Sequence, residues 1–122
     1  MLKSVLLVGI GGAFGSILRF LLSEYVFLYK RNLLPFATFI INIIGSFIIG
    51  LIMGYLLKQS EGQSLKLLIA VGFCGGFTTF STFALENIKL LQTGQYTIAL
   101  AYILASVFLS IVFVWIGLKL MA

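Results

Sequence analysis

The sequence predicts an all-α integral membrane protein that crosses the bilayer four times. Of its 122 residues, 61% are apolar and only 9% are charged, and the mean hydropathy of +1.21 lies far above that of soluble domains. A helix needs about 20 mostly apolar residues to cross a hydrocarbon core about 30 Å thick. Four such stretches fill the chain, at about residues 4–28, 35–57, 65–91 and 96–120. We expect one membrane domain over residues 1–122.

The first predicted span is too long for a cleavable signal peptide, because its apolar run continues to Leu28. It carries small residues on which a neighbouring helix can come close, and plain helix packing explains them. These residues are Gly9, Gly11, Gly12 and Gly15. Arg19 has two open interpretations: it faces protein or water inside the membrane, or it extends toward an interface. Glu24 is its candidate partner.

The second predicted span begins after Pro35, a residue that favours helix starts. Small and polar residues follow at strict four-residue spacing, which places them on one face. They are Thr38, Asn42, Ser46, Gly50 and Gly54. A close-packing seam is the simpler explanation for the last three. Asn42 differs, because leaving its amide unpaired in hydrocarbon would cost about 2 to 7 kcal/mol. It is therefore expected to face a partner helix or a polar pathway.

The third predicted span contains an interruption near the bilayer midplane. Gly75 and Gly76 precede a run of hydroxyl and β-branched residues, which favour non-helical backbone. One half-helix is expected to end near Cys74 and the next to start near Thr79. Irregular backbone at that depth persists only beside protein or a polar cavity, and transport proteins place ion sites at such breaks. The carbonyl end favours a cation and the amide end favours an anion.

Hydroxyl and aromatic side chains follow this break. Phe80 and Phe83 share a helix face, and lipid or core contact is the simpler explanation for both. Four hydroxyls lie in the same window, from Thr78, Thr79, Ser81 and Thr82. The fourth span sets three hydroxyls four residues apart, at Tyr102, Ser106 and Ser110. This ladder serves either helix-to-helix hydrogen bonding or a polar track for an ion.

The charges predict little about orientation. The net charge of +5 comes from basic residues at span ends, where they meet lipid head groups. Lys3, Lys58, Lys66 and Lys119 fall on one side of the membrane, and Lys30, Arg31 and Lys89 fall on the other. This bias is too weak to fix the topology, and four spans can hardly enclose a solvated pathway alone. We therefore expect insertion in both orientations and an antiparallel pair. A single cysteine, Cys74, excludes a disulfide framework.

Three motifs, in order on the first three spans, resemble those of the CrcB or Fluc fluoride channels. They are Gly11-Gly-Ala-Phe-Gly-Ser-Ile-Leu-Arg19, Asn42-Ile-Ile-Gly-Ser-Phe-Ile-Ile-Gly50 and Gly75-Gly-Phe-Thr-Thr-Phe-Ser-Thr-Phe83. The resemblance covers essentially the whole chain. It implies a dual-topology antiparallel homodimer with two pores in a microbial cell membrane, in bacteria the inner membrane. The implied activity is passive, fluoride-selective export that lowers fluoride toxicity.

The resemblance also implies roles for single residues. Phe80 and Phe83 would line the fluoride pore with their ring edges and face Asn42, and Arg19 would shape an aqueous vestibule. The remaining pore residues would be Ser81, Thr82, Tyr102, Ser106 and Ser110. A structural sodium ion would lie on the dimer axis, held by the backbone carbonyls of Gly75 and Thr78 from both subunits.

Two other functions stay open. A small multidrug exporter also uses four spans, but proton-coupled export needs a titratable group within the membrane. Glu86 comes closest among Glu24, Glu61 and Glu86, at about 12 Å of helix rise beyond the break. A non-transporting scaffold would use the seams and ladders for packing alone. An enzyme is not expected, because the sequence has no histidine, no paired carboxylates and no nucleophile with a visible base.

Overall fold

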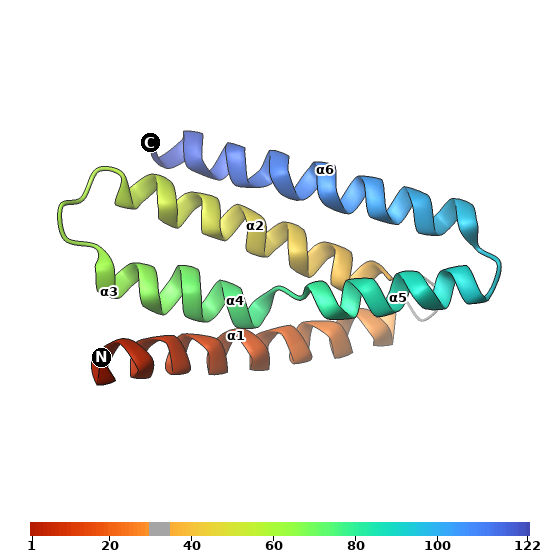
Figure 1. The fold of residues 1–122 in the computed structure, drawn as a ribbon, viewed down its shortest axis with the longest axis horizontal. Coiled ribbons are helices and arrows are strands. Elements are labelled where there is room, and N and C mark those ends of the chain that lie inside the picture. The colour runs from red at the N-terminus through yellow and green to blue at the C-terminus, as the bar shows by residue number, and fades with distance from the viewer. Residues whose placement is uncertain (30–34) are drawn as a thin grey trace.

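A computed structural model describes residues 1–29 and 35–122, so that Lys30 and Arg31 lie outside the described residues. The described chain is helical apart from short connections (Figure 1). The elements are α1 (Leu2–Tyr29), α2 (Phe36–Leu56), α3 (Gln63–Leu65), η1 (Lys66–Cys74), α4 (Gly75–Phe77), α5 (Phe80–Gln92) and α6 (Tyr96–Met121). Residues of η1 have the wider hydrogen bonding of a π-helix.

The described chain contains four helical segments that are long and apolar enough to cross a membrane. They cover Leu2–Tyr29, Phe36–Leu56, Gln63–Gln92 and Tyr96–Met121. The 21 residues of α2 rise by about 31 Å, which matches the thickness of a hydrocarbon core. The prediction of an all-α chain with four candidate spans is confirmed.

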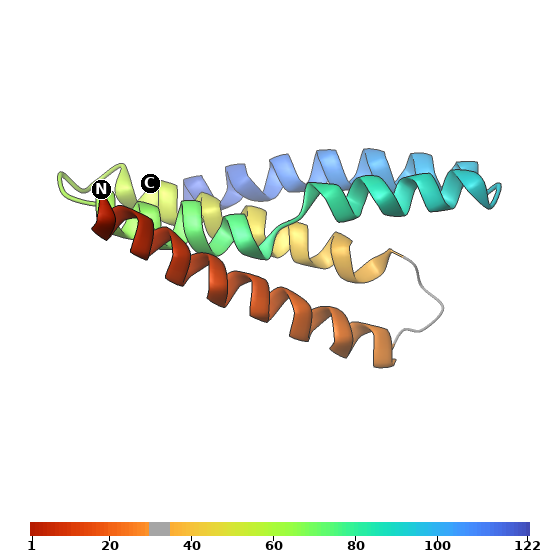
Figure 2. The same cartoon turned by 60° about the horizontal axis from the view of Figure 1, so that its bottom comes forward.

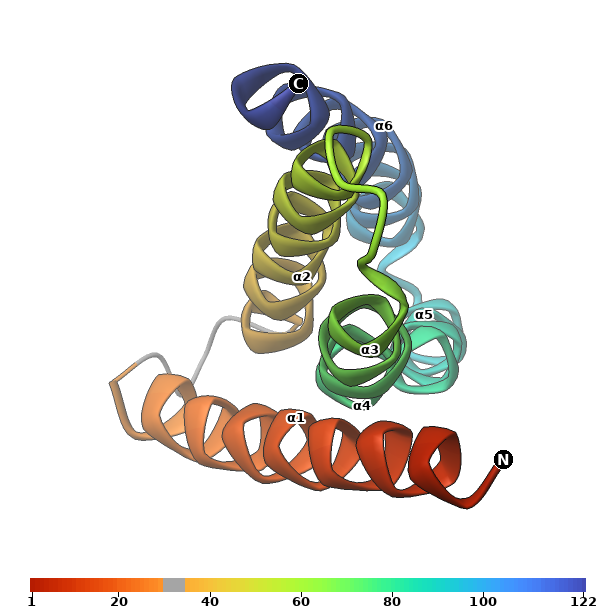
Figure 3. The same ribbon diagram turned by 90° about the vertical axis from the view of Figure 1, so that its left-hand side faces the viewer.

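The helices pack as two close pairs. One pair is α2 and α6, and the other is α1 with η1 and α4 (Figures 1 and 3). A Cβ atom added at Gly50 would overlap the carbonyl oxygen of Val114, and one added at Gly117 would lie 2.6 Å from that of Phe47. The backbones of α2 and α6 therefore touch, and the close-packing interpretation of Gly50 is confirmed.

Glycines also let helix α1 pack closely against η1. A Cβ atom at Gly11 would overlap the carbonyl oxygen of Leu68, and one at Gly15 would overlap that of Phe73. Gly9 differs, because an added Cβ would meet nothing within 4 Å. Towards its C-terminal end α1 diverges from the other helices, as Figure 2 shows.

The two ends of the molecule carry interfacial residues. Both termini and the α2–α3 connection lie at one end, and the α5–α6 turn lies at the other (Figure 1). At the first end the Lys119 Nζ atom lies 5.9 Å from the centroid of the Trp115 ring. At the other end the ring centroids of Tyr25 and Tyr29 are 4.7 Å apart. Tyrosine, tryptophan and lysine are typical of membrane interfaces.

The interior is small. A cluster of Leu90, Ala99 and Tyr102, with Phe39 and Phe83 packed against it, joins α5 to α6 and α2. Large apolar side chains are widely exposed over the described helices, as expected where lipid or a second subunit covers them.

Candidate functional site

The backbone leaves the helical conformation between α4 and α5. Thr78 (φ −84°, ψ 157°) and Thr79 (φ −149°, ψ 120°) are extended. Helical backbone continues to Phe77, past the end expected near Cys74. Gly75 and Gly76 both lie within this helical backbone. Gly76 lies against the carbonyl oxygen of Gly12, where the absence of a side chain permits close packing, whereas a Cβ atom added at Gly75 would meet nothing within 4 Å.

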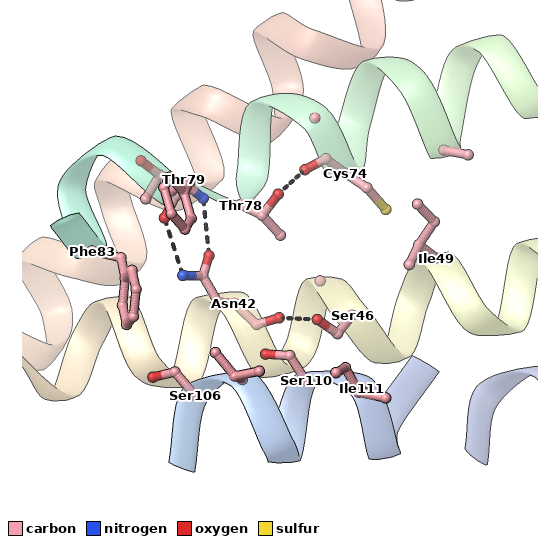
Figure 4. A pocket seen from close by; sticks show the side chains of 15 residues that line it. Asn42, Ser46, Ile49, Cys74, Thr78, Thr79, Phe83, Ser106, Ser110 and Ile111 are labelled. Atoms are coloured by element: carbon pink, nitrogen blue, oxygen red, sulfur yellow. Dashed lines mark hydrogen bonds between the residues drawn. The ribbon is translucent and has the colours of Figure 1, made fainter. Parts of the chain in front are cut away.

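Asn42 of α2 holds the extended segment through two hydrogen bonds. Its Nδ2 atom donates to the carbonyl oxygen of Thr79 at 3.1 Å, and its Oδ1 atom accepts from the Thr79 backbone N–H at 2.9 Å (Figure 4). Because Thr79 is extended, its backbone N–H and carbonyl have no helical hydrogen-bond partners, and the Asn42 amide takes the place of those partners. Asn42 was expected to face a partner helix or a polar pathway, and its amide pairs with the extended backbone between α4 and α5.

Both threonines use their hydroxyls locally. Thr78 Oγ1 donates to the carbonyl oxygen of Cys74 at 2.7 Å. Thr79 is the N-cap of α5, and its Oγ1 accepts from the Thr82 backbone N–H at 3.2 Å. Against α2, Gly45 provides room for Thr78, because an added Cβ would overlap the Thr78 Cγ2 atom.

A cavity of about 440 Å³ lies beside this segment, and its lining comes from α2, η1, α4, α5 and α6. It brings together five of the predicted pore residues and both predicted sodium ligands, and Figure 4 shows its lining. The pore residues are Asn42, Phe80, Phe83, Ser106 and Ser110, and the sodium ligands are Gly75 and Thr78. None of the residues that line this cavity has a charged side chain.

The aromatic rings form a connected group at one end of the cavity. The centroids of Phe80 and Phe83 are 5.6 Å apart, and Phe83 meets Tyr102 edge to face at 5.0 Å. Phe80 is 79% exposed in the single chain, which is unusual for a large ring that lines a cavity. Because of this exposure, the cavity reaches the protein surface at Phe80.

The three residues of the hydroxyl ladder on α6 differ in their burial and in whether they line the cavity. Ser106 is buried and its Oγ atom has no hydrogen-bond partner within the described residues, although the residue lines the cavity. Ser110 lines the cavity one turn away. Tyr102 lies outside the cavity lining, and its hydroxyl donates to Glu86 Oε1 at 3.5 Å, the limit of a hydrogen bond.

Three other predicted site residues lie outside the cavity lining. Ser81 is exposed and Thr82 belongs to the cap, where its Oγ1 atom accepts from Thr79 Oγ1 at 3.1 Å. Arg19 lies on α1, and its Nε atom donates to the carbonyl oxygen of Gly76 at 3.1 Å. This bond selects the protein-facing interpretation of Arg19. In the described part of the chain it has no ion pair with Glu24.

The carbonyl groups of Gly75 and Thr78 are the groups that could hold the sodium ion implied by the resemblance. In a continuous helix the Thr79 N–H would donate to the Gly75 carbonyl, but it donates to Asn42 instead. Likewise, the Thr82 N–H would donate to the Thr78 carbonyl in a continuous helix, but it donates to Thr79 Oγ1 instead. Backbone carbonyls freed in this way replace the hydration shell of ions in channels. No group of three or more His, Cys, Asp or Glu residues suited to a metal occurs among the described residues.

Three residues that contribute to the site were not predicted from the sequence. Thr79 is both the cap and the partner of Asn42, and a hydroxyl residue directly before a helix is the signal that would have indicated the cap. Ser46 lines the cavity, but its hydroxyl donates to the Asn42 carbonyl at 2.7 Å. The Cys74 side chain also lines the cavity (Figure 4). Nothing in the spacing of Cys74 indicated this.

Comparisons with known proteins give one family. A family model described as "CrcB-like protein, Camphor Resistance (CrcB)" matches residues 6–118. Three similar proteins each carry the name "Fluoride-specific ion channel FluC". The protein of Flavobacterium psychrophilum is 45% identical over 118 residues, which cover 96% of this chain and 95% of the relative. That of Azobacteroides pseudotrichonymphae is 44% identical over 108 residues (88% and 86%). That of Gloeothece citriformis is 41% identical over 116 residues (95% and 94%).

Proposed function

The chain belongs to the CrcB-like protein family, and from this membership we propose that it is a fluoride-specific ion channel of the cell membrane. It conducts fluoride passively out of the cell and so lowers fluoride toxicity. The expectation that it is not an enzyme agrees with the naming of its relatives as ion channels.

The observation that carries the proposal is the uncharged, donor-bearing cavity beside the extended segment. Fluoride is small and strongly hydrated, so a pathway must replace its water without binding it too tightly. The unpartnered Ser106 hydroxyl, the Ser110 hydroxyl and the second hydrogen on Asn42 Nδ2 supply neutral donors. The positive ring edges of Phe80 and Phe83 add weak attraction. The absence of a full positive charge from the lining avoids trapping the anion.

The working unit is an antiparallel homodimer in which each subunit has the opposite orientation. The exposure of Phe80 supports this, because a second copy would cover the ring and close the cavity on its open side. The weak charge difference between the two ends supports insertion both ways. Two such cavities then give two pores, with the extended segments near the bilayer midplane.

A sodium ion bound between the subunits by the carbonyls of Gly75 and Thr78 would supply a fixed positive charge between the pores. Asn42 helps to expose these carbonyls. It accepts the Thr79 N–H, which would donate to the Gly75 carbonyl in a continuous helix, and it holds Thr79 in the extended conformation. Thr79 contributes through its hydroxyl, which accepts the Thr82 N–H that would donate to the Thr78 carbonyl in a continuous helix. Removal of sodium is therefore expected to weaken the dimer as well as fluoride flux.

The exporter alternative depends on Glu86. This carboxylate lies outside the lining of the cavity, and it lines a separate cavity with Lys89 and residues of the α5–α6 turn. An exporter in which Glu86 exchanges protons for substrate would require transport that depends on a proton gradient and is lost in Glu86→Gln. The scaffold alternative requires that no ion is transported.

Fluoride efflux from liposomes tests the proposal. Purified protein is reconstituted in vesicles loaded with potassium fluoride or potassium chloride, and release is followed with an ion-selective electrode after addition of a potassium ionophore. Rapid fluoride release, little chloride release and no need for a proton gradient are expected. Silence for both ions, in protein shown to be folded by gel filtration, would contradict the channel and favour the other two functions.

A further inference from the structure

A second cavity, of about 770 Å³, lies at the end of the molecule that holds both termini. Its volume is within the range of small-molecule sites. It shares no residue with the cavity of the proposed pore. Its lining residues come from the end of α2, the α2–α3 connection, α3 and the first residue of η1. They are Met53, Leu56, Leu57, Ser60, Glu61, Gly62, Gln63, Ser64, Leu65 and Lys66.

Backbone contacts order the connection that forms this cavity. The Gln59 N–H donates to the carbonyl oxygen of Leu56 at 3.1 Å, and the Lys66 N–H donates to that of Gly62 at 2.9 Å. Gly62 itself lies against the Leu56 side chain, which would have to shift to admit a Cβ atom. The connection is thereby folded back onto the end of α2.

The cavity lies at a membrane–water interface. Because α2 is as long as a hydrocarbon core is thick, its last residue, Leu56, lies at the boundary. The lining changes from apolar to polar at the same level. Met53, Leu56 and Leu57 form the apolar part, and the residues from Ser60 to Ser64 form most of the polar part. A ligand with an apolar portion and a polar head fits this division.

The polar part carries one charge of each sign. Glu61 and Lys66 are the only charged residues of the lining, both are exposed, and neither forms an ion pair within residues 1–29 and 35–122. An unpaired carboxylate and an unpaired ammonium in one cavity complement a zwitterion. Ser60 and Ser64 add hydroxyl donors beside them.

We propose that this cavity binds the head group of a phospholipid with a primary ammonium, phosphatidylethanolamine. Lys66 and Ser64 donate to the phosphate, and Glu61 accepts from the ammonium. The acyl chains run along Met53 and Leu57. A choline head group lacks the N–H donors that Glu61 would accept, and a glycerol head group lacks the cation. In an antiparallel dimer, one such site would face each leaflet.

Native mass spectrometry of the purified protein tests this site. Phosphatidylethanolamine, phosphatidylcholine and phosphatidylglycerol with the same acyl chains are titrated in turn. We expect phosphatidylethanolamine to bind at least about threefold more tightly than the other two, the scale of an exposed ion pair. Glu61→Gln removes this preference, and Lys66→Gln weakens binding of all three lipids by about threefold.

Two matched variants show whether the lipid preference depends on the cavity or on the net charge of the protein. Glu24→Gln and Lys119→Gln make the same charge changes at exposed residues outside the lining, and we expect both to keep the preference. Equal binding of the three lipids by the unmodified protein, tighter binding of phosphatidylglycerol, or equal effects in the control variants would each overturn the proposal. Because no flux is measured, the result is independent of fluoride conduction.

Discussion

At the scale of single residues, Asn42 decides how the chain leaves the helix at Thr79. Its amide acts as both donor and acceptor to one backbone unit, as a neighbouring strand would. Leaving either group of Thr79 unpaired inside a membrane would cost about 1 to 3 kcal/mol. The remaining hydrogen of Nδ2 is free for the cavity. Asn42 therefore has a structural role and a proposed conducting role at once.

Asn42→Asp separates these roles. The carboxylate can still accept from the Thr79 N–H, but it cannot donate to the Thr79 carbonyl, and it adds a negative charge beside an anion pathway. We expect fluoride efflux from liposomes to fall by more than about tenfold, since unpaired like charges repel strongly at low dielectric. Gln95→Glu is the control, because it makes the same amide-to-carboxylate change at an exposed residue outside the cavity lining. Unchanged efflux in Asn42→Asp would remove Asn42 from the pathway.

The phenylalanine pair gives a second test at this scale. Phe80→Ile or Phe83→Ile removes the positive ring edge while keeping an apolar side chain, so we expect a sharp loss of fluoride efflux with the oligomer intact by gel filtration. Phe108 is 67% exposed and lies outside the cavity lining, so Phe108→Ile should conduct normally. If all three variants conduct equally, Phe80 and Phe83 are simply lipid or packing contacts.

At the scale of elements, the helices were predictable and the contacts that shape the site were not. Long apolar runs fix spans such as Phe36–Leu56, because only one backbone form satisfies its own hydrogen bonds in lipid. The paired glycines and hydroxyls indicated the window that holds the extended residues Thr78 and Thr79. Their location depends on Asn42, which is 37 residues away, and local sequence carries no signal of such a bond. Nor does it indicate the π-helical turns of η1.

The same limit applies to predicting which hydroxyl residues face the cavity. The family resemblance implied that Ser81 and Thr82 belong to the pore. In the structure Thr82 joins the cap of α5, and Thr79 Oγ1 takes its N–H. Capping competes with ligand contact for the same short side chains. A pattern of hydroxyls alone cannot show which of them are already used by the backbone.

The seam between α2 and α6 provides a test at the scale of elements. Gly117→Ala places a methyl group 2.6 Å from the Phe47 carbonyl oxygen, so the helices must separate. We expect a loss of stability of about 1 to 3 kcal/mol, seen as a lower thermal midpoint in detergent. Gly9→Ala is the matched control, since its methyl group meets nothing within 4 Å. Helix propensity should make that variant neutral or more stable by about 0.5 to 1 kcal/mol. Equal midpoints would show that the seam tolerates separation.

At the scale of the whole molecule, the two ends differ little in charge and much in what they carry. One end holds both termini and the proposed lipid cavity, and the other holds the α5–α6 turn (Figure 1). If the chain inserts in both orientations, each side of the membrane receives both kinds of end. Two copies in opposite orientations could then cover the exposed Phe80 of one another.

Cysteine labelling in spheroplasts tests this arrangement. Ala122→Cys and Gln95→Cys place single thiols at exposed positions on opposite ends, in a Cys74→Ala background that removes the buried thiol. Because the weak charge bias favours neither orientation, a membrane-impermeant maleimide should label about half of each variant. Permeabilised cells should show complete labelling of both. A fixed orientation would instead give complete labelling of one variant and none of the other, and an antiparallel dimer could not form from such chains. The two thiols therefore report the orientation of the chain from opposite ends, and only a dual-topology protein gives the same labelled fraction at both.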